Sequence, residues 1–349
     1  NYYIQQLEEN SSQEKMWPLL VDRYIPGLEC EVDVISDGQN VIVPGIFEHI
    51  ERAGVHSGDS ISVFPPISLA AEIKETLIDY AEKIAKSAPI VGIMNIQFVI
   101  YQNQVLVLEV NPRSSRTVPI MSKVTGVPMI EWAVMVQLGV SLNSLSAETG
   151  LLAEPNYYSV KTPVFSRSKL KGVDHVLGPE MKSTGEVLGL GATFHEALEK
   201  AFPTSNGETE NYLFCSIADR EKPASLPILQ QFVNESYKLI ATEGTAKFLQ
   251  EKGFTIEQVI KDNEDVNELF KNNTIQAVIN IPNQGRNKIK FGFYIREQAT
   301  RYNVPVFTHL DTVQAMVSLQ AQSIAQSEVR TVTEYYNIKE SGVEHVKCD

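Results

Sequence analysis

Three oxygen-bearing side chains in the first half of the chain could together hold a divalent metal ion. Glu109 and Asn111 are two residues apart on a segment predicted to be extended, so both side chains leave the same face of that strand. Gln97 lies on the preceding predicted strand of the same hairpin, at about the same height. Mg²⁺ prefers oxygen ligands and takes only a few of them from protein, with phosphates and water supplying the rest. The spacing therefore predicts a metal site, but a short Glu-x-Asn-Pro-Arg segment is also typical of a polar strand end with surface arginines.

Two arginines directly follow these residues in the sequence. Arg113 and Arg116 come after the predicted strand has ended at Pro112, which cannot donate a hydrogen bond to a neighbouring strand. Guanidinium groups bind phosphate oxygens through several hydrogen bonds at once. Arginines beside a divalent cation therefore indicate chemistry on a phosphate group.

A glycine-containing loop between residues 49 and 60 is a second candidate site. Gly54 and Gly58 flank small polar residues, and glycine allows a backbone to approach a ligand closely. A connecting loop with one or two solvated histidines would explain the same residues, so His56 alone does not define an acid–base group.

A third candidate site lies in the second half of the chain. Thr242, Gly244 and Thr245 follow a predicted strand and open a predicted helix, where backbone N–H groups and hydroxyls can bind an anion. Lys222 comes from the loop after the preceding strand, at the same carboxyl edge of the sheet, where ligands of open α/β sheets bind. A threonine that only caps the helix is the alternative.

The elements that must position these residues differ between the two halves. Hairpins are predicted over 28–48, with a turn at Asp37-Gly38, and over 91–110, and helices over 68–86 and 128–138. In the first hairpin, Cys30, Val32 and Val34 alternate with acidic residues, which predicts a half-buried strand. After a predicted linker at 200–211, strands alternate with helices, which predicts a small α/β domain with a parallel sheet. That part has strands over 212–217, 238–241, 277–280 and 304–308 and helices over 224–236, 245–252 and 293–302.

Composition excludes several classes of protein. The 349 residues carry a formal net charge of −13, which argues against duplex nucleic acid and anionic membranes as partners. Three widely spaced cysteines argue against a disulfide scaffold or a zinc finger and fit a reducing cytoplasm. The most apolar stretch, 88–101, is too short to span a bilayer. The N-terminus shows no signal-peptide pattern and no initiator Met, which favours a fragment or a processed product. The tail after about residue 330 is polar and is predicted to be poorly ordered.

Three long segments together resemble the C-terminal half of the carbamoyl-phosphate synthase large subunit. They are residues 51–60, with Ala-Gly-Val-His-Ser-Gly-Asp-Ser, residues 109–119, with Glu-Val-Asn-Pro-Arg-x-x-Arg-Thr-Val-Pro, and residues 178–187, with Gly-Pro-Glu-Met-Lys-Ser-Thr-Gly-Glu-Val. They occur in the family's order, and the resemblance covers roughly residues 1–335. It implies an α+β ATP-grasp lobe, mostly an antiparallel sheet with helices, followed by a methylglyoxal-synthase-like domain.

The resemblance also implies a reaction and the residues that carry it. This half would use ATP to phosphorylate carbamate, with Mg²⁺ or Mn²⁺ as the metal. Arg116, Arg113 and Asn111 match catalytic positions, and Gln97, Glu109 and Asn111 match metal ligands. The matching ATP-binding residues are Asp22, Tyr24, Glu29, Gly54, Val55, His56, Ser57, Gln97 and Glu109.

In the second domain the resemblance implies an allosteric nucleotide site for an effector of the UMP or IMP type. The matching residues are Lys222, Thr242, Gly244, Thr245, Lys261 and Asn280. The family often has a threonine two residues after the asparagine, where this chain has Pro282. An ornithine-type site would use His49, Glu51, Asp59 and Thr308, but Thr162 replaces an expected acidic residue, which predicts poor ornithine binding and favours a pyrimidine-regulated enzyme.

The implied organisation is a partial ATP-grasp domain at 1–150, a connection at 151–207, an allosteric domain at 208–335 and a tail at 336–349. The implied partners are the rest of the large subunit and the glutaminase small subunit, in the cytoplasm, with the oligomeric state left open. Because few residues precede the adenine segment and none form a glycine-rich lid, the chain alone is predicted to be inactive. Two alternatives remain at this point: another ATP-grasp ligase, such as a biotin carboxylase or purine ligase, and a non-catalytic nucleotide-sensing protein.

Overall fold

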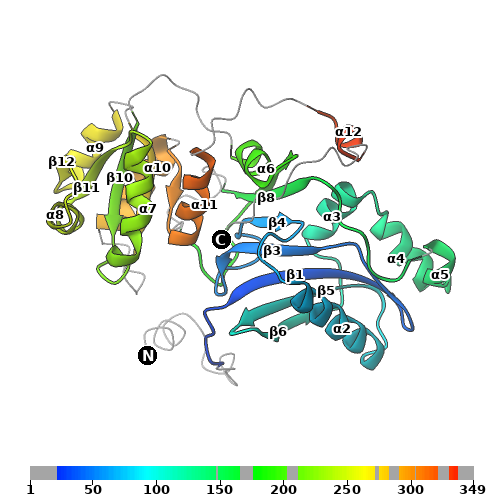
Figure 1. Cartoon of the computed structure of the whole chain (residues 1–349). Helices are drawn as coiled ribbons and strands as arrows, with labels where there is room; N and C mark the ends of the chain where they lie inside the picture. The colour runs from blue at the N-terminus through cyan, green and yellow to red at the C-terminus, as the bar shows by residue number, and fades with distance from the viewer. Residues whose placement is uncertain are drawn as a thin grey trace, which may run out of the picture.

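The computed structural model describes residues 22–146, 148–165, 176–202, 211–271, 275–282, 291–302, 304–320 and 330–336. These residues form two sheets with separate sets of helices, and the two units lie side by side (Figure 1). The predicted fold class is therefore confirmed: a mostly antiparallel sheet with helices is followed by a parallel sheet with helices. Of the predicted linker at 200–211, residues 203–210 lie outside the described residues, and residues 200 and 201 belong to a helix.

The first unit is built on a sheet of nine described strands. Seven strands run in the order β6-β5-β1-β3-β4-β8-β9 with antiparallel pairing, while β2 pairs with β1 and, in parallel, with β7. The strands are β1 (Leu28–Asp37), β2 (Val41–Val43), β3 (Ile46–Arg52), β4 (Ser62–Phe64), β5 (Val91–Tyr101), β6 (Gln104–Asn111), β7 (Gly150–Leu151), β8 (Tyr158–Val164) and β9 (Gly185–Gly191). The helices are α2 (Ala71–Ser87), α3 (Thr117–Thr125), α4 (Met129–Gln137), α5 (Leu142–Leu145), α6 (Phe194–Ala201) and α12 (Val332–Tyr336).

The two faces of β1 have different neighbours. Cys30, Val32 and Val34 pack with α2 on one face, as the alternating pattern predicts. On the other face Ile35 packs with α3 and α4. Glu29, Glu31 and Asp33 alternate with the apolar residues that face α2. The half-buried strand was nevertheless a wrong prediction, because the acidic residues are as buried as the apolar ones. Neighbouring polar side chains cover them, and only the pairing of distant strands creates that cover.

The second unit is a five-stranded parallel sheet in the order β12-β11-β10-β13-β14. Helices α9 and α10 pack on one face, and α7, α8 and α11 pack on the other. The strands are β10 (Tyr212–Ile217), β11 (Lys238–Thr242), β12 (Ile256–Ile260), β13 (Ile275–Ile281) and β14 (Val306–Phe307). The helices are α7 (Lys222–Asn234), α8 (Glu243–Glu251), α9 (Asn263–Lys271), α10 (Phe291–Tyr302) and α11 (Leu310–Gln320).

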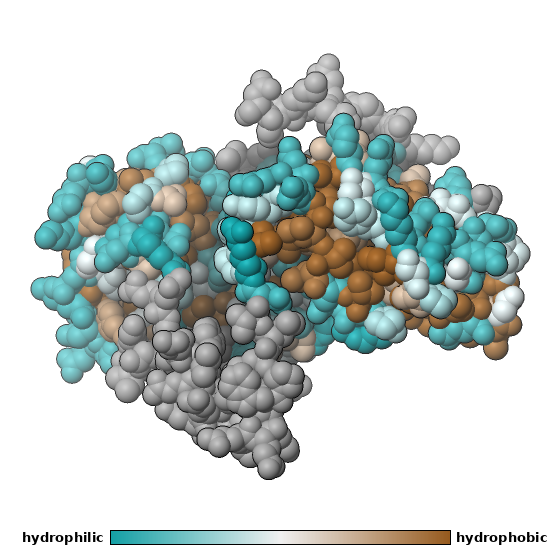
Figure 2. Space-filling model, turned by 90° about the horizontal axis from the view of Figure 1, so that it is seen from below, coloured by the Kyte–Doolittle hydropathy of each residue, from teal (hydrophilic) through white to brown (hydrophobic). Residues whose placement is uncertain are grey.

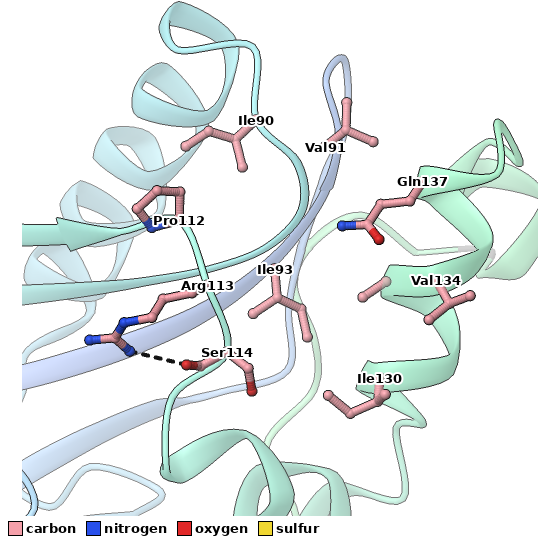
Figure 3. Close-up of a pocket in the computed structure, with 10 residues that line it drawn as sticks. Ile90, Val91, Ile93, Pro112, Arg113, Ser114, Ile130, Val134 and Gln137 are labelled. Carbon is pink, nitrogen blue, oxygen red and sulfur yellow. Dashed lines mark hydrogen bonds between the residues drawn. The ribbon is translucent and has the colours of Figure 1, made fainter.

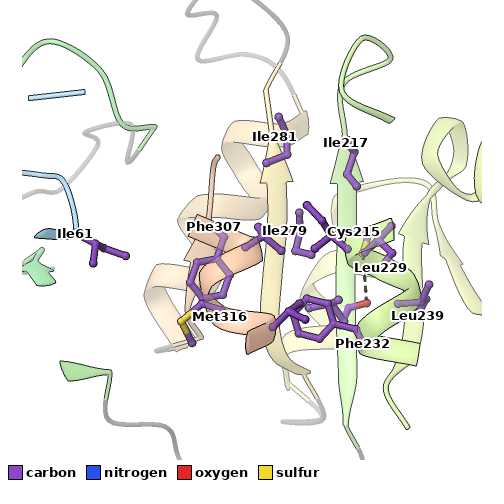
Figure 4. Packing of buried hydrophobic residues seen from close by; sticks show 14 of the residues in the cluster. Ile61, Cys215, Ile217, Leu229, Phe232, Leu239, Ile279, Ile281, Phe307 and Met316 are labelled. Atoms are coloured by element: carbon purple, nitrogen blue, oxygen red, sulfur yellow. Dashed lines mark hydrogen bonds between the residues drawn. The ribbon is translucent and has the colours of Figure 1, made fainter. Parts of the chain in front are cut away.

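The two units share a hydrophobic cluster. Ile61, Val63 and Val160 of the first unit belong to the same cluster as the core around Cys215 and Phe307, and Figure 4 shows Ile61 facing the side of that core where Phe307 and Met316 lie. Polar contacts cross the same boundary. Thr312 Oγ1 donates to Glu51 Oε1 over 2.7 Å, and Arg52 Nε lies 3.8 Å from Asp311 Oδ1. The first turns of α11 are therefore joined directly to the end of β3.

Most predicted elements are present with shifted ends. The predicted second hairpin is β5–β6, whose turn places Gln102 and Asn103 at positive φ, and β12 and α9 were not predicted. Residues 332–336 form α12 rather than an unstructured tail, because Tyr335 is buried and donates to Leu190 O. Cys30 and Cys215 are free and buried.

The described helices include none with the length and apolar character needed to cross a membrane. Seen from below, apolar residues gather near the middle of the surface with hydrophilic residues around them (Figure 2). Val107 and Leu108 of the edge strand β6 are among the exposed large hydrophobic residues.

Candidate functional site

Strands β5 and β6 bring the three predicted metal ligands together. Gln97 and Glu109 are direct cross-strand partners, and Asn111 Nδ2 donates to Glu109 Oε1 over 2.7 Å. Gln97 Nε2 donates to Ser57 Oγ over 3.2 Å. Because both amides use their nitrogens in these hydrogen bonds, their oxygens and the Glu109 carboxylate are the atoms presented to a cation. This donor set fits Mg²⁺ or Mn²⁺, which complete their coordination with phosphate and water.

The site contains one carboxylate rather than a carboxylate cluster. The described part of the chain has no group of three or more His, Cys, Asp or Glu residues arranged to hold a metal. A cation at Gln97, Glu109 and Asn111 would therefore depend strongly on the charge of a phosphate ligand.

The loop at 54–60 lies beside these residues and is held by two distant segments. His56 N donates to Gly178 O over 2.8 Å, and His56 Nδ1 accepts from Gly58 N over 3.0 Å. On the other side Lys161 Nζ donates to Ser57 O over 2.8 Å. Since Lys161 is only 1% exposed, a buried ammonium fixes the backbone of this loop.

The three segments that carry the family resemblance converge at Asp59, Ser183 and Arg116. Asp59 accepts hydrogen bonds from the backbone N–H groups of Lys182 and Ser183, both over 2.8 Å. Ser183 Oγ donates to Gly58 O over 2.9 Å and accepts from Arg116 Nη1 over 3.2 Å. Residues far apart in the sequence thus form one connected polar group next to the predicted metal ligands.

Arg113, the second predicted arginine, lies beside an open hollow of about 410 Å³. Figure 3 shows Ile93, Ile130 and Val134 facing this hollow from β5 and α4, while Arg113 extends along the 112–114 segment. Arg113 Nη1 donates to Ser114 O over 3.0 Å. Arg113 therefore neighbours Arg116 along the chain, but its guanidinium is held by its own segment rather than by Ser183.

The predicted adenine and ribose residues approach the same loop. Tyr24 Oη donates to Ala53 O over 2.8 Å, and Gly54 has a φ of +110°. A Cβ on Gly54 would also lie only 3.1 Å from the Tyr24 ring, so this position requires glycine. Glu29 accepts a backbone hydrogen bond from Gly54. Asp22 is exposed at the start of the described residues, and Val55 is buried.

A buried charged group lies behind the loop. His49 is fully buried, with its two ring nitrogens 3.7 Å from Glu29 Oε1 and 3.5 Å from Glu31 Oε1. Burial raises the pKa of Glu29, and the charge of His49 opposes that rise only in part. At Glu31 burial also favours the neutral acid, but His49 and Lys161 outweigh it and lower the pKa. The strand face behind the loop at 54–60 therefore carries buried titratable side chains rather than apolar ones.

The four residues predicted for an ornithine-type site each lie close to other polar groups of the protein. Glu51 accepts from Thr312 and from Ile61 N, and Asp59 accepts from the backbone N–H groups of residues 182 and 183. His49 lies between the acidic residues of β1, and Thr308 Oγ1 accepts from Leu177 N over 3.4 Å. The two carboxylates that a cationic amine would need are thus already hydrogen-bonded within the protein.

In the second unit, the predicted effector residues lie at the carboxyl ends of adjacent parallel strands. Thr242 ends β11, Lys261 follows β12, Lys222 follows β10 after a short turn, and Asn280 is near the end of β13. Neighbouring strands place Thr242 opposite Ile260 and Asn280 opposite Ser216. This edge is where open parallel sheets bind ligands.

Lys222 and Thr245 form the centre of this edge. Lys222 is 7% exposed, and its Nζ donates to Gly244 O and lies 2.6 Å from Asp219 Oδ1. Thr245 Oγ1 accepts from Ile217 N over 3.0 Å and from Thr242 Oγ1 over 3.3 Å. Thr242 occupies the N-cap position of α8 without a side-chain capping bond, so it does not act as a plain helix cap.

Asn280 contributes an unsatisfied donor at the same edge. Its side-chain oxygen accepts from Arg296 Nη1, while its buried Nδ2 has no hydrogen-bond partner. Lys261 is exposed, and its backbone N–H donates to Asp265. The edge thus combines two lysines, two hydroxyls and an amide donor, which suits an anionic ligand.

Several residues of both sites were not identified from the sequence. They are Glu31, Asp33, Asn95, Lys161, Asp219, Arg296 and Thr312. The acidic alternation of β1 was a usable signal, but it was read as the outer face of a strand. The contacts of Lys161 and Thr312 cross 104 and 261 residues, and no local pattern predicts such pairs.

Comparisons with known families agree with this division of the chain. Residues 4–145 match the family described as "Carbamoyl-phosphate synthase L chain, ATP binding domain". Residues 224–308 match the family described as "MGS-like domain". The two matches fall on the antiparallel and the parallel unit, respectively.

Similar proteins carry names from the same family. The chain is 44% identical over 329 residues to the carbamoyl phosphate synthase large chain of Clostridium botulinum strain Loch Maree, covering 93% of this chain and 30% of that one. It is 45% identical over 318 residues to that of strain Kyoto, covering 89% and 30%. The chain therefore spans about 30% of the length of these relatives. Among solved structures, biotin carboxylase from Campylobacter jejuni is 24% identical with a TM-score of 0.35, over 42% of this chain and 33% of that one.

Proposed function

By its two domains this chain belongs to the carbamoyl-phosphate synthase large-chain family, and from that premise we propose that it is the carbamate-phosphorylating and nucleotide-regulated part of such an enzyme. The observation that carries the proposal is the convergence of three distant segments at Arg116, Ser183 and Asp59, beside Gln97 and Glu109. The match to an MGS-like domain favours this family over other ATP-grasp ligases.

In the proposed reaction, the protein mainly positions and neutralises charge. Gln97, Glu109 and Asn111 would hold Mg²⁺ or Mn²⁺, which supplies charge neutralisation to the phosphates when bound. Arg116, oriented by Ser183, would contact the phosphoryl group that moves from ATP to carbamate, with Arg113 as a second cation nearby. The loop at 54–57 would line the nucleotide with its backbone, and Lys161 keeps that backbone in place.

The other end of ATP would be bound by the segment that contacts Ala53 and Gly54. Asp22 and Tyr24 would lie at the adenine, with Glu29 toward the ribose hydroxyls. The Tyr24–Ala53 hydrogen bond and the backbone bond from Gly54 to Glu29 support this assignment, because they bring both groups to the phosphate loop.

The second domain would bind a nucleotide effector of the UMP or IMP type. Lys222, Thr242, Gly244 and Thr245 would hold its phosphate, and Lys261 and Asn280 would contact the rest of the molecule. The effect of this ligand would reach the first domain through α11, which packs against α7 behind Lys222 and is bonded to Glu51 through Thr312. The hydrogen bonds that Glu51 and Asp59 already accept within the protein support weak ornithine binding.

The full synthase reaction would need more than this chain. We expect the remainder of a large chain to complete the ATP site and a glutaminase subunit to supply ammonia, since the chain spans about 30% of its relatives. Purified alone, it should not make carbamoyl phosphate from ammonia, bicarbonate and ATP. A robust rate of synthesis by the 349-residue chain would contradict this expectation.

Calorimetric titration of ATP with Mg²⁺ or with a chelator tests the catalytic half of the proposal. We expect Mg²⁺-dependent binding, and Glu109→Gln should weaken it by more than the roughly 10–100-fold expected for a residue beyond the direct ligands. Glu131→Gln is the matched control, because Glu131 is also an exposed glutamate of this unit but lies on α4. Equal binding by Glu109→Gln and the unmodified chain would count against the metal assignment.

A further inference from the structure

Asp33 is a buried carboxylate that the proposed reaction does not use. It lies in the middle of β1, opposite Asn95 of β5, and is 1% exposed. Burying a carboxylate is unfavourable unless hydrogen bonds compensate for the lost water. The partners of Asp33 therefore indicate what its burial achieves.

Two of these partners flank Arg116 in the sequence. Ser115 Oγ donates to Asp33 Oδ1 over 2.7 Å, and Thr117 Oγ1 donates to Asp33 Oδ2 over 2.6 Å. One carboxylate thus binds the residue before Arg116 and the residue after it. The peptide units on both sides of Arg116 are fixed to the sheet by this single group.

The same contact fixes the start of α3. Ser115 Oγ accepts from the backbone N–H groups of Thr117 and Val118, over 3.2 and 3.3 Å. These N–H groups belong to the first turn of α3, where backbone N–H groups have no hydrogen-bond partner within the helix. Asp33 orients Ser115, Ser115 caps α3, and Arg116 lies at the N-cap between them.

Other buried groups hold Asp33 in turn. Asn95 Nδ2 donates to Asp33 Oδ1 over 2.9 Å and lies 3.3 Å from Glu31 Oε2. Burial and the nearby charge of Glu31 raise the pKa of Asp33 to about 6, although its three donors oppose the rise. At neutral pH the group is ionised and accepts all three hydrogen bonds.

We propose that Asp33 is the positioning residue for Arg116, holding its backbone while Ser183 holds its guanidinium. The inference rests on the proposed function, in which Arg116 contacts the transferring phosphoryl group. Arg116 is exposed, so its own packing does not fix its position. The hydrogen bonds of Asp33 to the neighbouring residues and the hydrogen bond from Arg116 to Ser183 fix it instead. Asp33 touches no reacting atom in this account and acts only through Ser115 and Thr117.

The test compares the affinities of the 349-residue chain for MgATP and MgADP by calorimetry. The ratio of the MgATP affinity to the MgADP affinity reports how much the terminal phosphate, which Arg116 would contact, adds to binding. Arg116→Ala should lower the ratio by about tenfold, as expected for one hydrogen bond between charged groups. Asp33→Ala and the size-matched Thr117→Val should lower it too, and Asp33→Asn should lower it less because the amide oxygen still accepts.

Two further variants separate positioning from general damage. Asp33→Ala combined with Arg116→Ala should lower the ratio no further than Arg116→Ala does alone, because both act on the same contact. Asp37→Asn is the matched control: it changes another aspartate of β1 that accepts from a turn and from Leu142 N, and it should leave the ratio unchanged. Equal losses of MgATP and MgADP affinity in Asp33→Ala would overturn the proposal.

Amide hydrogen exchange tests, without ATP, whether Asp33 holds the backbone around Arg116. Peptides covering 112–121 should exchange faster in Asp33→Ala and Thr117→Val than in the unmodified chain or in Asp37→Asn. If Arg116→Ala leaves the nucleotide ratio unchanged, the assigned role of Arg116 fails, and faster exchange still supports positioning by Asp33. If no nucleotide binds to this part of the large chain, hydrogen exchange alone decides on the positioning role. Unchanged exchange in both variants would overturn the positioning role itself.

Discussion

The two domains build their candidate sites from different parts of a β-sheet. In the first domain, the site lies on a sheet face, and the buried Lys161 donates to Ser57 O and lowers the pKa of Glu31 by its charge. In the second domain, the site lies at an edge, where Lys222 and Lys261 follow the ends of parallel strands. We therefore expect the residues of the first site to contribute strongly to the free energy of unfolding, and those of the second site to contribute much less.

Replacing the buried lysine of each site should reveal this difference most strongly. Lys161→Met leaves the buried Glu31 without one of its cations, so we expect it to lower the free energy of unfolding by about 3–5 kcal/mol. Lys222→Met should cost only about 1 kcal/mol or less, because its carboxylate partner Asp219 is 92% exposed and remains solvated.

The two tryptophans allow this comparison to be made in urea. Trp132 lies on α4 of the first domain, and neither tryptophan lies in the sequence of the second domain, so fluorescence changes at Trp132 follow the first domain while far-UV circular dichroism follows both. Equal destabilisation by Lys161→Met and Lys222→Met would break the contrast between a face site and an edge site.

Binding should show the opposite pattern at the edge site. Lys222→Ala combined with Thr245→Ala should weaken UMP binding by more than about tenfold, since a hydrogen bond to a charged group and a hydroxyl contact are both lost. Calorimetric titration of UMP at fixed ionic strength measures the loss. Unchanged UMP affinity in the double variant would contradict the proposal that the phosphate binds at the start of α8.

The pH dependence of unfolding sharpens the account of the face site. The pKa of Asp33 is raised from 3.8 to about 6 in the folded chain, so its contribution favours folding at low pH and is lost as the pH rises through about 6. Asp33→Asn removes this ionisation, so the stability of the variant relative to the unmodified chain should increase between pH 5 and 7.5. Urea midpoints from fluorescence measure it, and a constant difference over that range would show that Asp33 does not ionise as described.

The smallest expected effect concerns Asp219. Its carboxylate competes with an incoming phosphate for Lys222, so Asp219→Asn should raise UMP affinity by about two- to fivefold at low salt. The gain should shrink at high ionic strength because the contact is exposed. Glu251→Gln, at the far end of α8, should change nothing. A loss of affinity in Asp219→Asn would mean that Asp219 orients Lys222 instead of competing for it.

The sequence was sufficient for features that depend on local rules. The Asp37-Gly38 turn, the β5–β6 hairpin and the position of Thr242 at the end of β11 each follow from neighbouring residues, and the structure shows all three. The pairing of Gln97 with Glu109 depends on more than the turn, because the register of the two strands shifts between Gln97 and Phe98.

The remaining features depend on contacts between distant parts of the chain. The acidic face of β1 was expected to be half exposed, yet Asp33 is covered by Ser115 and Thr117, more than 80 residues away in the sequence. The ornithine-type residues were grouped by resemblance, whereas Glu51 is bonded to Thr312 of the other domain. Such pairs arise from the order of strands in the sheet and from domain packing, which local periodicity does not encode.

The most direct test of the account is to titrate MgATP into the chain with and without saturating UMP, and UMP with and without saturating MgATP. The account predicts that each nucleotide changes the affinity of the other by the same factor, because coupling between two binding sites is reciprocal. Thr312→Val, which removes the hydrogen bond between α11 and Glu51, should bring that factor closer to one. If both nucleotides bind and neither alters the affinity of the other, the proposal of nucleotide feedback through the second domain is contradicted.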